Sequence, residues 1–201
     1  MRTKDFTRAV LLLVCLCCMT ACGDDKLDPN SYEALSRQHI GEFTLKKIHW
    51  DGQSVDMNND GVARWDLLEN EMDKALGYYP PNHEAKVEEG KVPTEWNGRP
   101  FLNVLAQLPY PLYESSEKGH IVKRIAYLPV NLQMIYYDNL SSTIINHVPH
   151  SDESDIFIGK IEEILISEFK PETFTIRVRC TMYDLNQEET TNYLRYTYER
   201  K

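Results

Sequence analysis

The sequence is short of basic residues. Of its 201 residues, 22 are Lys or Arg and 31 are Asp or Glu, which gives a formal net charge of −9. A protein that binds nucleic acid holds the phosphate backbone with Lys and Arg, so this charge argues against that class of partner. Glycine and proline are also few, at 9 and 10 residues, and 42% of the chain is hydrophobic. This balance indicates a globular chain and excludes a disordered or collagen-like one.

Long hydrophobic runs are absent as well. A membrane-spanning helix needs about 20 apolar residues, and the longest apolar run covers only residues 9–19. Three basic residues, Arg2, Lys4 and Arg8, precede that run. A basic start followed by a short apolar run is typical of a secretory signal peptide. We therefore predict that residues 1–21 are a signal peptide and that the chain is exported.

The junction after the apolar run points to a lipid anchor. Met19-Thr20-Ala21-Cys22 resembles the lipobox of bacterial lipoproteins. In that family the cysteine carries a diacylglycerol, so the resemblance implies that Cys22 is the lipidated residue and that the chain contacts the membrane through this lipid. Acyl chains can hold a protein on a bilayer because each buried CH₂ contributes about 0.8 kcal/mol. The alternative is an ordinary signal peptide with a chance cysteine.

Cysteine is scarce in the remainder of the chain. Of five cysteines, three lie in the predicted signal peptide and one is Cys22, so Cys180 alone remains and no internal disulfide can form. Cys180 lies in an alternating strand pattern and is expected to be a small buried hydrophobic residue.

The charge near the anchor suggests a location. Residues 1–21 hold three basic groups and one acid, so their removal would change the net charge from −9 to −11. Asp24 and Asp25 follow Cys22 and resemble the short acidic signals that direct some Gram-negative lipoproteins to the outer face of the outer membrane. We therefore expect a lipid-anchored outer-membrane protein exposed at the cell surface, and the alternative is that these residues are only a solvated linker.

The chain is expected to form one domain behind a tether. Residues 22–37 show no sustained periodicity and are predicted to be a flexible tether with one helical turn at 32–35. Residues 38–201 have the length of a single domain.

Alternating apolar and polar residues predict antiparallel strands through most of this domain. The clearest pattern runs through Phe174, Ile176, Val178, Cys180 and Met182, separated by polar residues. Polar turns at 170–173 and 184–190 would connect the last three strands. The expected strands are residues 42–50, 101–107, 128–136, 161–169, 174–183 and 192–199. The expected fold is all-β, either an antiparallel up-and-down barrel or a β-sandwich.

One helix and two long loops interrupt this pattern. Helical periodicity covers residues 65–76, where Leu68, Met72, Ala75 and Leu76 share a face. Residues 77–100 and 141–155 are predicted loops, the second with a strand-like stretch at 143–148. Loops of this length are uncommon in compact domains unless they are functional or disordered.

One motif has metal-binding chemistry. In Asp56-Met57-Asn58-Asn59-Asp60-Gly61, side-chain oxygens recur at the first, third and fifth positions, and Gly61 permits the sharp turn that brings them onto one Ca²⁺. The twelfth position, which is Glu in an EF-hand, is Leu67, so Asp66 or Glu69 would have to substitute. The alternative is a polar turn in which Asn and Asp side chains bond their own backbone. The residues expected to hold calcium are Asp56, Asn58, Asp60, Val62 and Asp66.

The same stretch carries a family resemblance. Residues 55–71, with Asp-x-Asn-x-Asp-Gly leading into Asp-Leu-Leu-x-Asn-Glu, resemble small lipocalin-like lipoproteins of Gram-negative bacteria. The signal and the closing strands at 161–199 follow the same pattern, whereas residues 77–127 lie outside the resemblance. It implies an up-and-down antiparallel barrel or sandwich and no particular ligand.

Catalytic motifs are missing. There is no Gly-x-Ser-x-Gly elbow, His-Glu-x-x-His helix, P-loop or Gly-x-Gly-x-x-Gly turn. Ser115-Ser116-Glu117-Lys118 matches Ser-x-x-Lys without its partner motifs and is predicted to be a turn. His147 and His150 could bind a metal only if a third ligand came from elsewhere in the chain, and the alternative is a solvated loop. The adjacent pairs Glu88-Glu89 and Glu162-Glu163 would point to opposite faces of a strand. We predict that the protein is not an enzyme.

Aromatic residues near prolines suggest binding. Tyr78, Tyr79, Trp96, Tyr110 and Tyr113 could stack on sugars or peptides from loops, or plug the end of a barrel. The leading hypothesis is a lipocalin-like binder of a small apolar ligand. The alternatives are a structural or interaction module with a calcium-rigidified loop, and a protein that acts on glycans, which would need two carboxylates facing one cleft.

Overall fold

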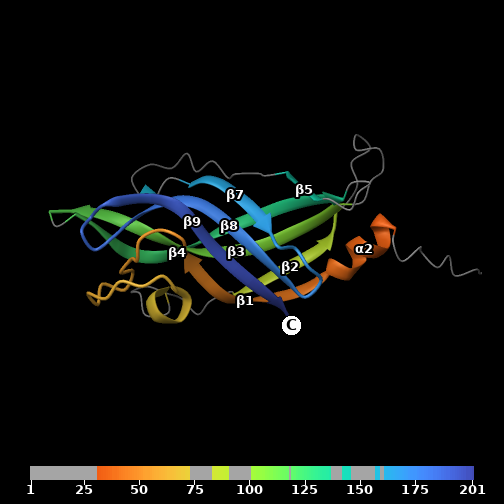
Figure 1. Cartoon of the computed structure of the whole chain (residues 1–201), viewed down its shortest axis with the longest axis horizontal. Coiled ribbons are helices and arrows are strands. Elements are labelled where there is room, and N and C mark those ends of the chain that lie inside the picture. The colour runs from red at the N-terminus through yellow and green to blue at the C-terminus, as the bar shows by residue number, and fades with distance from the viewer. Residues whose placement is uncertain are drawn as a thin grey trace, which may run out of the picture.

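The protein is an antiparallel β-barrel that is nearly closed. In the computed structural model the described residues are 31–72, 83–90, 101–117, 119–136, 142–145, 157–158 and 161–201. Seven strands build the barrel (Figure 1). They are β1 (Gly41–Trp50), β2 (Glu84–Glu89), β3 (Phe101–Ser116), β4 (Gly119–Tyr136), β7 (Ile161–Ser167), β8 (Thr173–Tyr183) and β9 (Glu189–Arg200). Between the alternatives left open by the sequence, the structure is a barrel.

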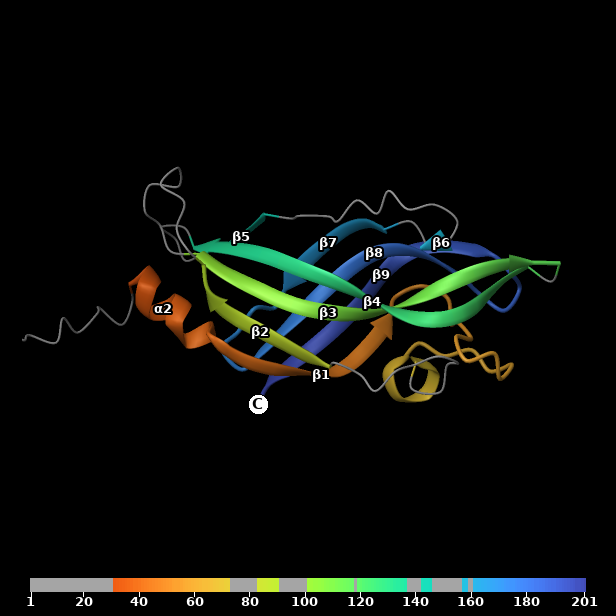
Figure 2. The same cartoon turned by 180° about the vertical axis from the view of Figure 1, so that it is seen from behind.

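The sheet wraps around in the order β5-β4-β3-β2-β1-β9-β8-β7. The short strand β5 (Ser142–Ile145) pairs with the end of β4. Another short strand, β6 (Phe157–Ile158), precedes β7 in sequence and pairs with β3 at Leu112 and Tyr113. This pairing brings the β7 end of the sheet back to the β3–β4 hairpin (Figure 2).

The strands form because one face of each is apolar. In β8 the side chains of Phe174, Ile176, Val178, Cys180 and Met182 are all fully buried, and polar residues alternate with them. Leu194, Tyr196 and Tyr198 of β9 face the same interior. One contiguous apolar cluster runs from β1 through β9. The alternation predicted these strands, and the turns before and after β8 are confirmed by the backbone bonds Lys170 N to Thr173 O and Gln187 N to Asp184 O.

Three strand predictions are corrected. β4 begins at Gly119 rather than at 128. β2 lies inside the segment predicted to be a loop at 77–100; the rest of that segment is described only at 83 and 90. Only Ala85 and Val87 of β2 are apolar, so the strand is held mainly by its neighbours β1 and β3. β3 runs to Ser116 rather than to 107, and it includes Pro109 and Pro111. Along one edge, β3 pairs with β2 up to Ala106 and with β6 from Leu112. Both prolines lie between these two pairings, where no described strand needs their missing N–H groups.

The helical segment begins later than predicted. A π-helical turn covers Leu68–Met72, whereas the predicted helix began at 65; its residues 73–76 lie outside the described part. The preceding residues are extended because they pair with other segments: Arg64 bridges to Val55 and Asp66 bridges to His49. Leu67 N also donates to Ile48 O at 2.9 Å, which holds the segment against the end of β1.

A second helix, α2 (Tyr32–His39), lies at the opposite end of the barrel (Figures 1 and 2). Ser31 caps it by accepting a hydrogen bond from Ala34 N at 3.2 Å. Its residues overlap the predicted tether. The His39 ring stacks on Phe169 with 4.5 Å between the ring centroids, so the last turn of α2 packs against the barrel.

Candidate functional site

The barrel interior is filled with large side chains. The largest fully buried ones include Trp50, Tyr196, Tyr198, Phe43 and Phe174. The Phe174 ring stacks on Tyr198 at 4.9 Å and meets Phe43 edge-on at 4.9 Å. The Tyr196 hydroxyl donates to Pro109 O at 2.8 Å, across the interior. Barrels of about this strand number are narrow enough for side chains to fill them.

Two of the aromatic residues predicted near loops belong to this interior. Tyr110 and Tyr113 lie in β3 and are 2% and 4% exposed. Tyr113 packs edge-on against Tyr183 at 5.1 Å, and Tyr110 lies beside the Cys180 thiol. Burial raises the pKa of both tyrosines well above the usual range and raises the pKa of Cys180 to about 12. The prediction that Cys180 is a buried hydrophobic residue is confirmed. Tyr78, Tyr79 and Trp96 lie outside the described residues.

A groove of about 530 Å³ crosses the outer face of β1, β2, β3 and β4. Cross-strand pairing explains which residues meet there: Glu42 faces Lys86, Lys86 faces Leu105, and Leu105 faces Asn131. Gln107 and Pro129 form the neighbouring pair. Backbone and small side chains of the inward positions Ala85, Ala106 and Val130 complete the floor.

Ion pairs fix one side of the groove. Lys201 Nζ lies 2.5 Å from Glu84 Oε1 and 3.3 Å from Glu42 Oε2. Lys86 Nζ lies 2.6 Å from Glu88 Oε2. The Glu84 hydrogen bond raises the pKa of Lys201, and the Glu88 hydrogen bond raises the pKa of Lys86. The groove therefore has charged residues toward β1 and β2 and neutral Gln107, Pro129 and Asn131 toward β4.

The acidic loop of the sequence forms a compact turn. Asp56 accepts hydrogen bonds from Asp60 N at 3.1 Å and Gly61 N at 2.7 Å. Asn58 Oδ1 accepts from Asp60 N at 2.9 Å, and Asp60 Oδ1 accepts from Val62 N at 2.8 Å. Gly61 has φ +82°, as the sequence predicted for the sharp turn. The hydrogen bond from Val62 is the main cause that lowers the pKa of Asp60.

Glu71 binds this loop from its buried side, and the sequence analysis did not identify it. Its side chain is fully buried, and Oε2 accepts hydrogen bonds from Met57 N at 2.9 Å and Asn58 N at 3.3 Å. Oε1 accepts a hydrogen bond from Arg64, whose guanidinium also reaches Asp60 Oδ2 at 3.3 Å. The bond to Glu71 raises the pKa of Arg64. One buried carboxylate and one arginine thus hold both sides of the loop.

The structure separates Asp66 from the other predicted calcium ligands. Asp66 Oδ1 accepts from His49 Nδ1 at 2.9 Å and lies 3.0 Å from Lys47 Nζ, on β1. These two partners, His49 first, lower the pKa of Asp66. Asp56, Asn58, Asp60 and Val62 do share one turn. Its oxygens bond the loop's own N–H groups and Arg64, which is the hydrogen bonding expected of the alternative, a polar turn.

Calcium binding by this loop stays a prediction. Within the described ranges, no group of three or more His, Cys, Asp and Glu side chains is close enough to hold a metal ion. Loop amide and carbonyl oxygens are also calcium ligands, so native mass spectrometry with and without EDTA tests the prediction.

The remaining sequence candidates are placed as follows. Ser115 and Ser116 end β3, directly before the hairpin turn to β4. Glu162 and Glu163 engage different partners, Arg179 at 3.3 Å and the Tyr193 hydroxyl at 2.8 Å. Cys22, His147 and His150 lie outside the described residues. In the part of the chain that the structure describes, no helix has the length and apolar character to cross a membrane.

Comparisons with known proteins give no relative: no family model, curated protein or solved structure matches this chain. The barrel itself is consistent with a lipocalin-like fold and compatible with ligand binding.

Proposed function

We propose that the protein is a lipid-anchored lipoprotein of the Gram-negative cell envelope that acts by binding, and that the groove across β1–β4 is its binding site. The observation that carries this proposal is the groove, because its volume of about 530 Å³ falls in the range typical of small-molecule sites, about 300–1,000 Å³. The proposed ligand site of this lipocalin-like barrel is therefore on its outer face and not in its interior.

The filled interior supports this choice. A lipocalin-like binder holds its ligand inside the barrel, but here large buried side chains, among them Trp50 and Tyr196, occupy that space. A ligand inside would have to displace well-packed rings. The outer groove needs no such displacement.

The residues of the groove favour a small amphipathic ligand. Leu105 and Pro129 offer an apolar surface, while the Gln107 and Asn131 amides offer hydrogen-bond donors and acceptors. Glu42 and Glu84 both face the groove, but Lys201 binds both of them. A glycan-cleaving pair needs one protonated and one ionised carboxyl group, and two carboxylates sharing an ammonium are better suited to positioning Lys201. We therefore propose binding without turnover.

The groove is tested by purifying the full chain from its membrane in mild detergent and identifying bound small molecules by mass spectrometry. Gln107→Trp should fill the groove and abolish co-purification, because Gln107 is exposed and a tryptophan is accommodated on a strand. Arg124→Trp is the matched control, since Arg124 is an exposed β4 residue outside the groove. Equal ligand recovery from both variants would refute the proposal that the groove is the binding site. A bare wild-type polypeptide would favour the second candidate, a structural or interaction module.

The anchor is tested separately. Cys22→Ser should abolish labelling by a fatty-acid probe and release the chain from the membrane fraction. Labelling that persists in Cys22→Ser would overturn the proposed anchor while leaving the groove untouched.

A further inference from the structure

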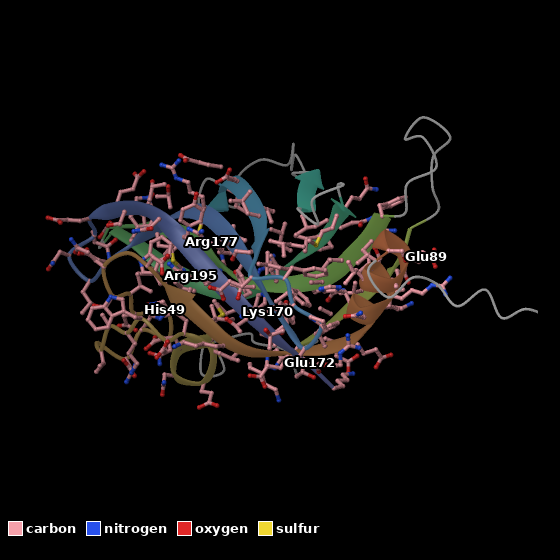
Figure 3. All side chains as sticks on the ribbon, turned by 45° about the vertical axis from the view of Figure 1, so that its right-hand side comes forward. His49, Glu89, Lys170, Glu172, Arg177 and Arg195 are labelled. Atoms are coloured by element: carbon pink, nitrogen blue, oxygen red, sulfur yellow. The ribbon has the colours of Figure 1, made fainter. Side chains whose placement is uncertain are left out.

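A row of basic side chains crosses the outer face of three neighbouring strands, away from the groove. Arg177 of β8 faces Arg195 of β9, and Arg195 faces His49 of β1. All three point outward, because the residues on either side of each in its strand are buried. Figure 3 shows these three side chains following one another across the sheet. Like charges directly opposite on adjacent strands repel each other.

Two members of the row have carboxylate partners. Asp51 Oδ2 accepts from Arg195 Nε at 2.7 Å and lies 2.6 Å from a terminal nitrogen of the same guanidinium. His49 Nδ1 lies 2.9 Å from Asp66 Oδ1. Arg195 is therefore held in one orientation, with Asp51 on the side of β1.

Arg177 has no such partner. Among the described residues it forms no ion pair, and its Nε is buried without a hydrogen-bond acceptor. The guanidinium lies over the Tyr193 ring, 4.0 Å from the ring centroid. The carboxylates nearest in the sheet are engaged elsewhere: Glu162 with Arg179 and Glu163 with the Tyr193 hydroxyl. Stacking on Tyr193 fixes the plane of the Arg177 guanidinium and leaves its donors without an acceptor.

Arg177 and Arg195 are thus paired directly across β8 and β9, the first held by stacking on Tyr193 and the second by Asp51. Arginine forks match the oxygen geometry of phosphate and form bidentate, charge-assisted hydrogen bonds with it. Thr197, the next outward residue of β9, is half-buried, and its hydroxyl group can donate to a further oxygen. A phosphate between the arginines would also remove their mutual repulsion.

We infer that the outer face of β8 and β9 binds a phosphate group between Arg177 and Arg195. The group can come from inorganic phosphate or from a phosphate monoester on a larger molecule, which share this chemistry. The inference uses neither the groove nor the lipid anchor, so it stands or falls independently of the proposed function.

The test is titration calorimetry of the purified full-length protein in detergent, with inorganic phosphate and, separately, glycerol 3-phosphate at constant ionic strength. We expect saturable binding of at least one of them. Saturation by both indicates that the phosphate group alone is recognised, and saturation by glycerol 3-phosphate alone indicates a monoester. Saturation by inorganic phosphate alone indicates a site closed to esters.

Variants locate the site. Arg177→Gln and Arg195→Gln should each raise Kd by about tenfold or more, because each removes a positive charge and the terminal guanidinium donors. The matched control Arg179→Gln, on the same strand and face but paired with Glu162, should change Kd by less than about twofold. Arg177→Lys keeps the charge without the fork, and it should weaken Kd by about three- to tenfold; it decides the question if Arg177→Gln fails to fold. Absence of saturation with both probes, or equal Kd in wild type and the Arg177 variants, would overturn the inference.

Discussion

At each end of the barrel one charged side chain makes several hydrogen bonds, and these two side chains carry opposite charges. At the loop end Glu71 collects hydrogen bonds from Met57 N, Asn58 N and Arg64. At the α2 end Arg200 donates them, from Nε to Pro171 O at 2.8 Å and from its terminal nitrogens to Ile40 O at 2.9 Å and Gln38 O at 2.6 Å. Each residue therefore ties an irregular segment to the sheet.

The two differ in burial. The Glu71 side chain is fully buried, whereas that of Arg200 is 26% exposed and lies over the Phe43 ring at 5.0 Å. If a buried carboxylate is removed, water cannot reach the buried N–H group that it bound. If a guanidinium near the surface is removed, water can bind the carbonyl groups that it leaves. Two similar sets of hydrogen bonds should therefore contribute differently to the free energy of unfolding, because one is more deeply buried than the other.

Removal of Glu71 should have the largest effect. We expect Glu71→Ala to lower the free energy of unfolding by about 3 kcal/mol, because the buried Met57 N–H is left without an acceptor and the bonds from Asn58 N and Arg64 are lost as well. Glu69→Ala, an exposed residue of the same helical turn, should change it by less than about 0.5 kcal/mol. Chemical denaturation measures both. Equal effects would show that burial of Glu71 has no energetic role.

Arg200→Ala should come second, at about 2 kcal/mol, since water replaces part of what the guanidinium supplies. Arg200→Lys keeps the charge but cannot reach three carbonyls in a fork, so about half of the loss should remain. Chemical denaturation gives the free energies, and hydrogen exchange in α2 gives the local effect. A loss in Arg200→Ala larger than that in Glu71→Ala would reverse the comparison of the two ends.

The barrel interior offers a smaller test of the same rule on buried partners. Tyr196→Phe removes the bond to Pro109 O and should cost about 1 kcal/mol. The Tyr198 hydroxyl is buried without a hydrogen-bond partner in the described structure, so Tyr198→Phe should change stability by about 0 kcal/mol or raise it. Thermal unfolding of the two variants compares them directly, and an equal loss in both would contradict the assignment.

Acidification should weaken the loop end slightly. The pKa of Asp60 is lowered in the fold, first by the Val62 N–H. A carboxylate with a lowered folded pKa stabilises the fold above its unfolded pKa, and this stabilisation is lost as pH falls through the folded value. The stability difference between wild type and Asp60→Asn should therefore shrink between about pH 6 and about pH 3. A difference that does not change over this range would show that Asp60 has no such role.

Calcium should have the smallest effect, because the loop carboxylates already accept hydrogen bonds from backbone N–H groups and from Arg64. We expect no rise in the unfolding temperature on adding Ca²⁺ and no calcium mass by native mass spectrometry. An added mass of one calcium, lost with EDTA and in Asp60→Ala, would instead establish the calcium loop predicted from the sequence. A bound ion would stabilise in proportion to RT ln(1 + [L]/Kd).

The sequence predicted most of the sheet, because strands with one buried face carry their pattern locally. β8 is the clearest example, with five alternating buried residues between two polar turns. β2 was not predicted because two apolar residues are too few to show a period. Its place between β1 and β3 comes from long-range pairing. The helix start was wrong because bridges to Val55 and His49 override the local periodicity at 64–66.

The sites were harder to predict than the strands. The acidic turn was visible in sequence because its residues are contiguous. Nothing local distinguishes buried Glu71 from exposed Glu69, since the geometry of one helical turn decides which enters the core. The groove assembles residues of four strands, so the strand order is needed to reveal it, and the Arg177–Arg195 pair depends on the exact register of the β8–β9 hairpin.

The position of β1 has a consequence for when the barrel can fold. β1 lies between β2 and β9, and Lys201 N donates to Glu42 O at 3.0 Å, so an early strand is completed by a late one. Contacts this distant in sequence close slowly, since the chain entropy of a long loop must be lost first. Until β9 is available, one edge of β1 has no partner and the barrel cannot close. A chain synthesised from its N-terminus therefore cannot close its barrel until β9 has been made.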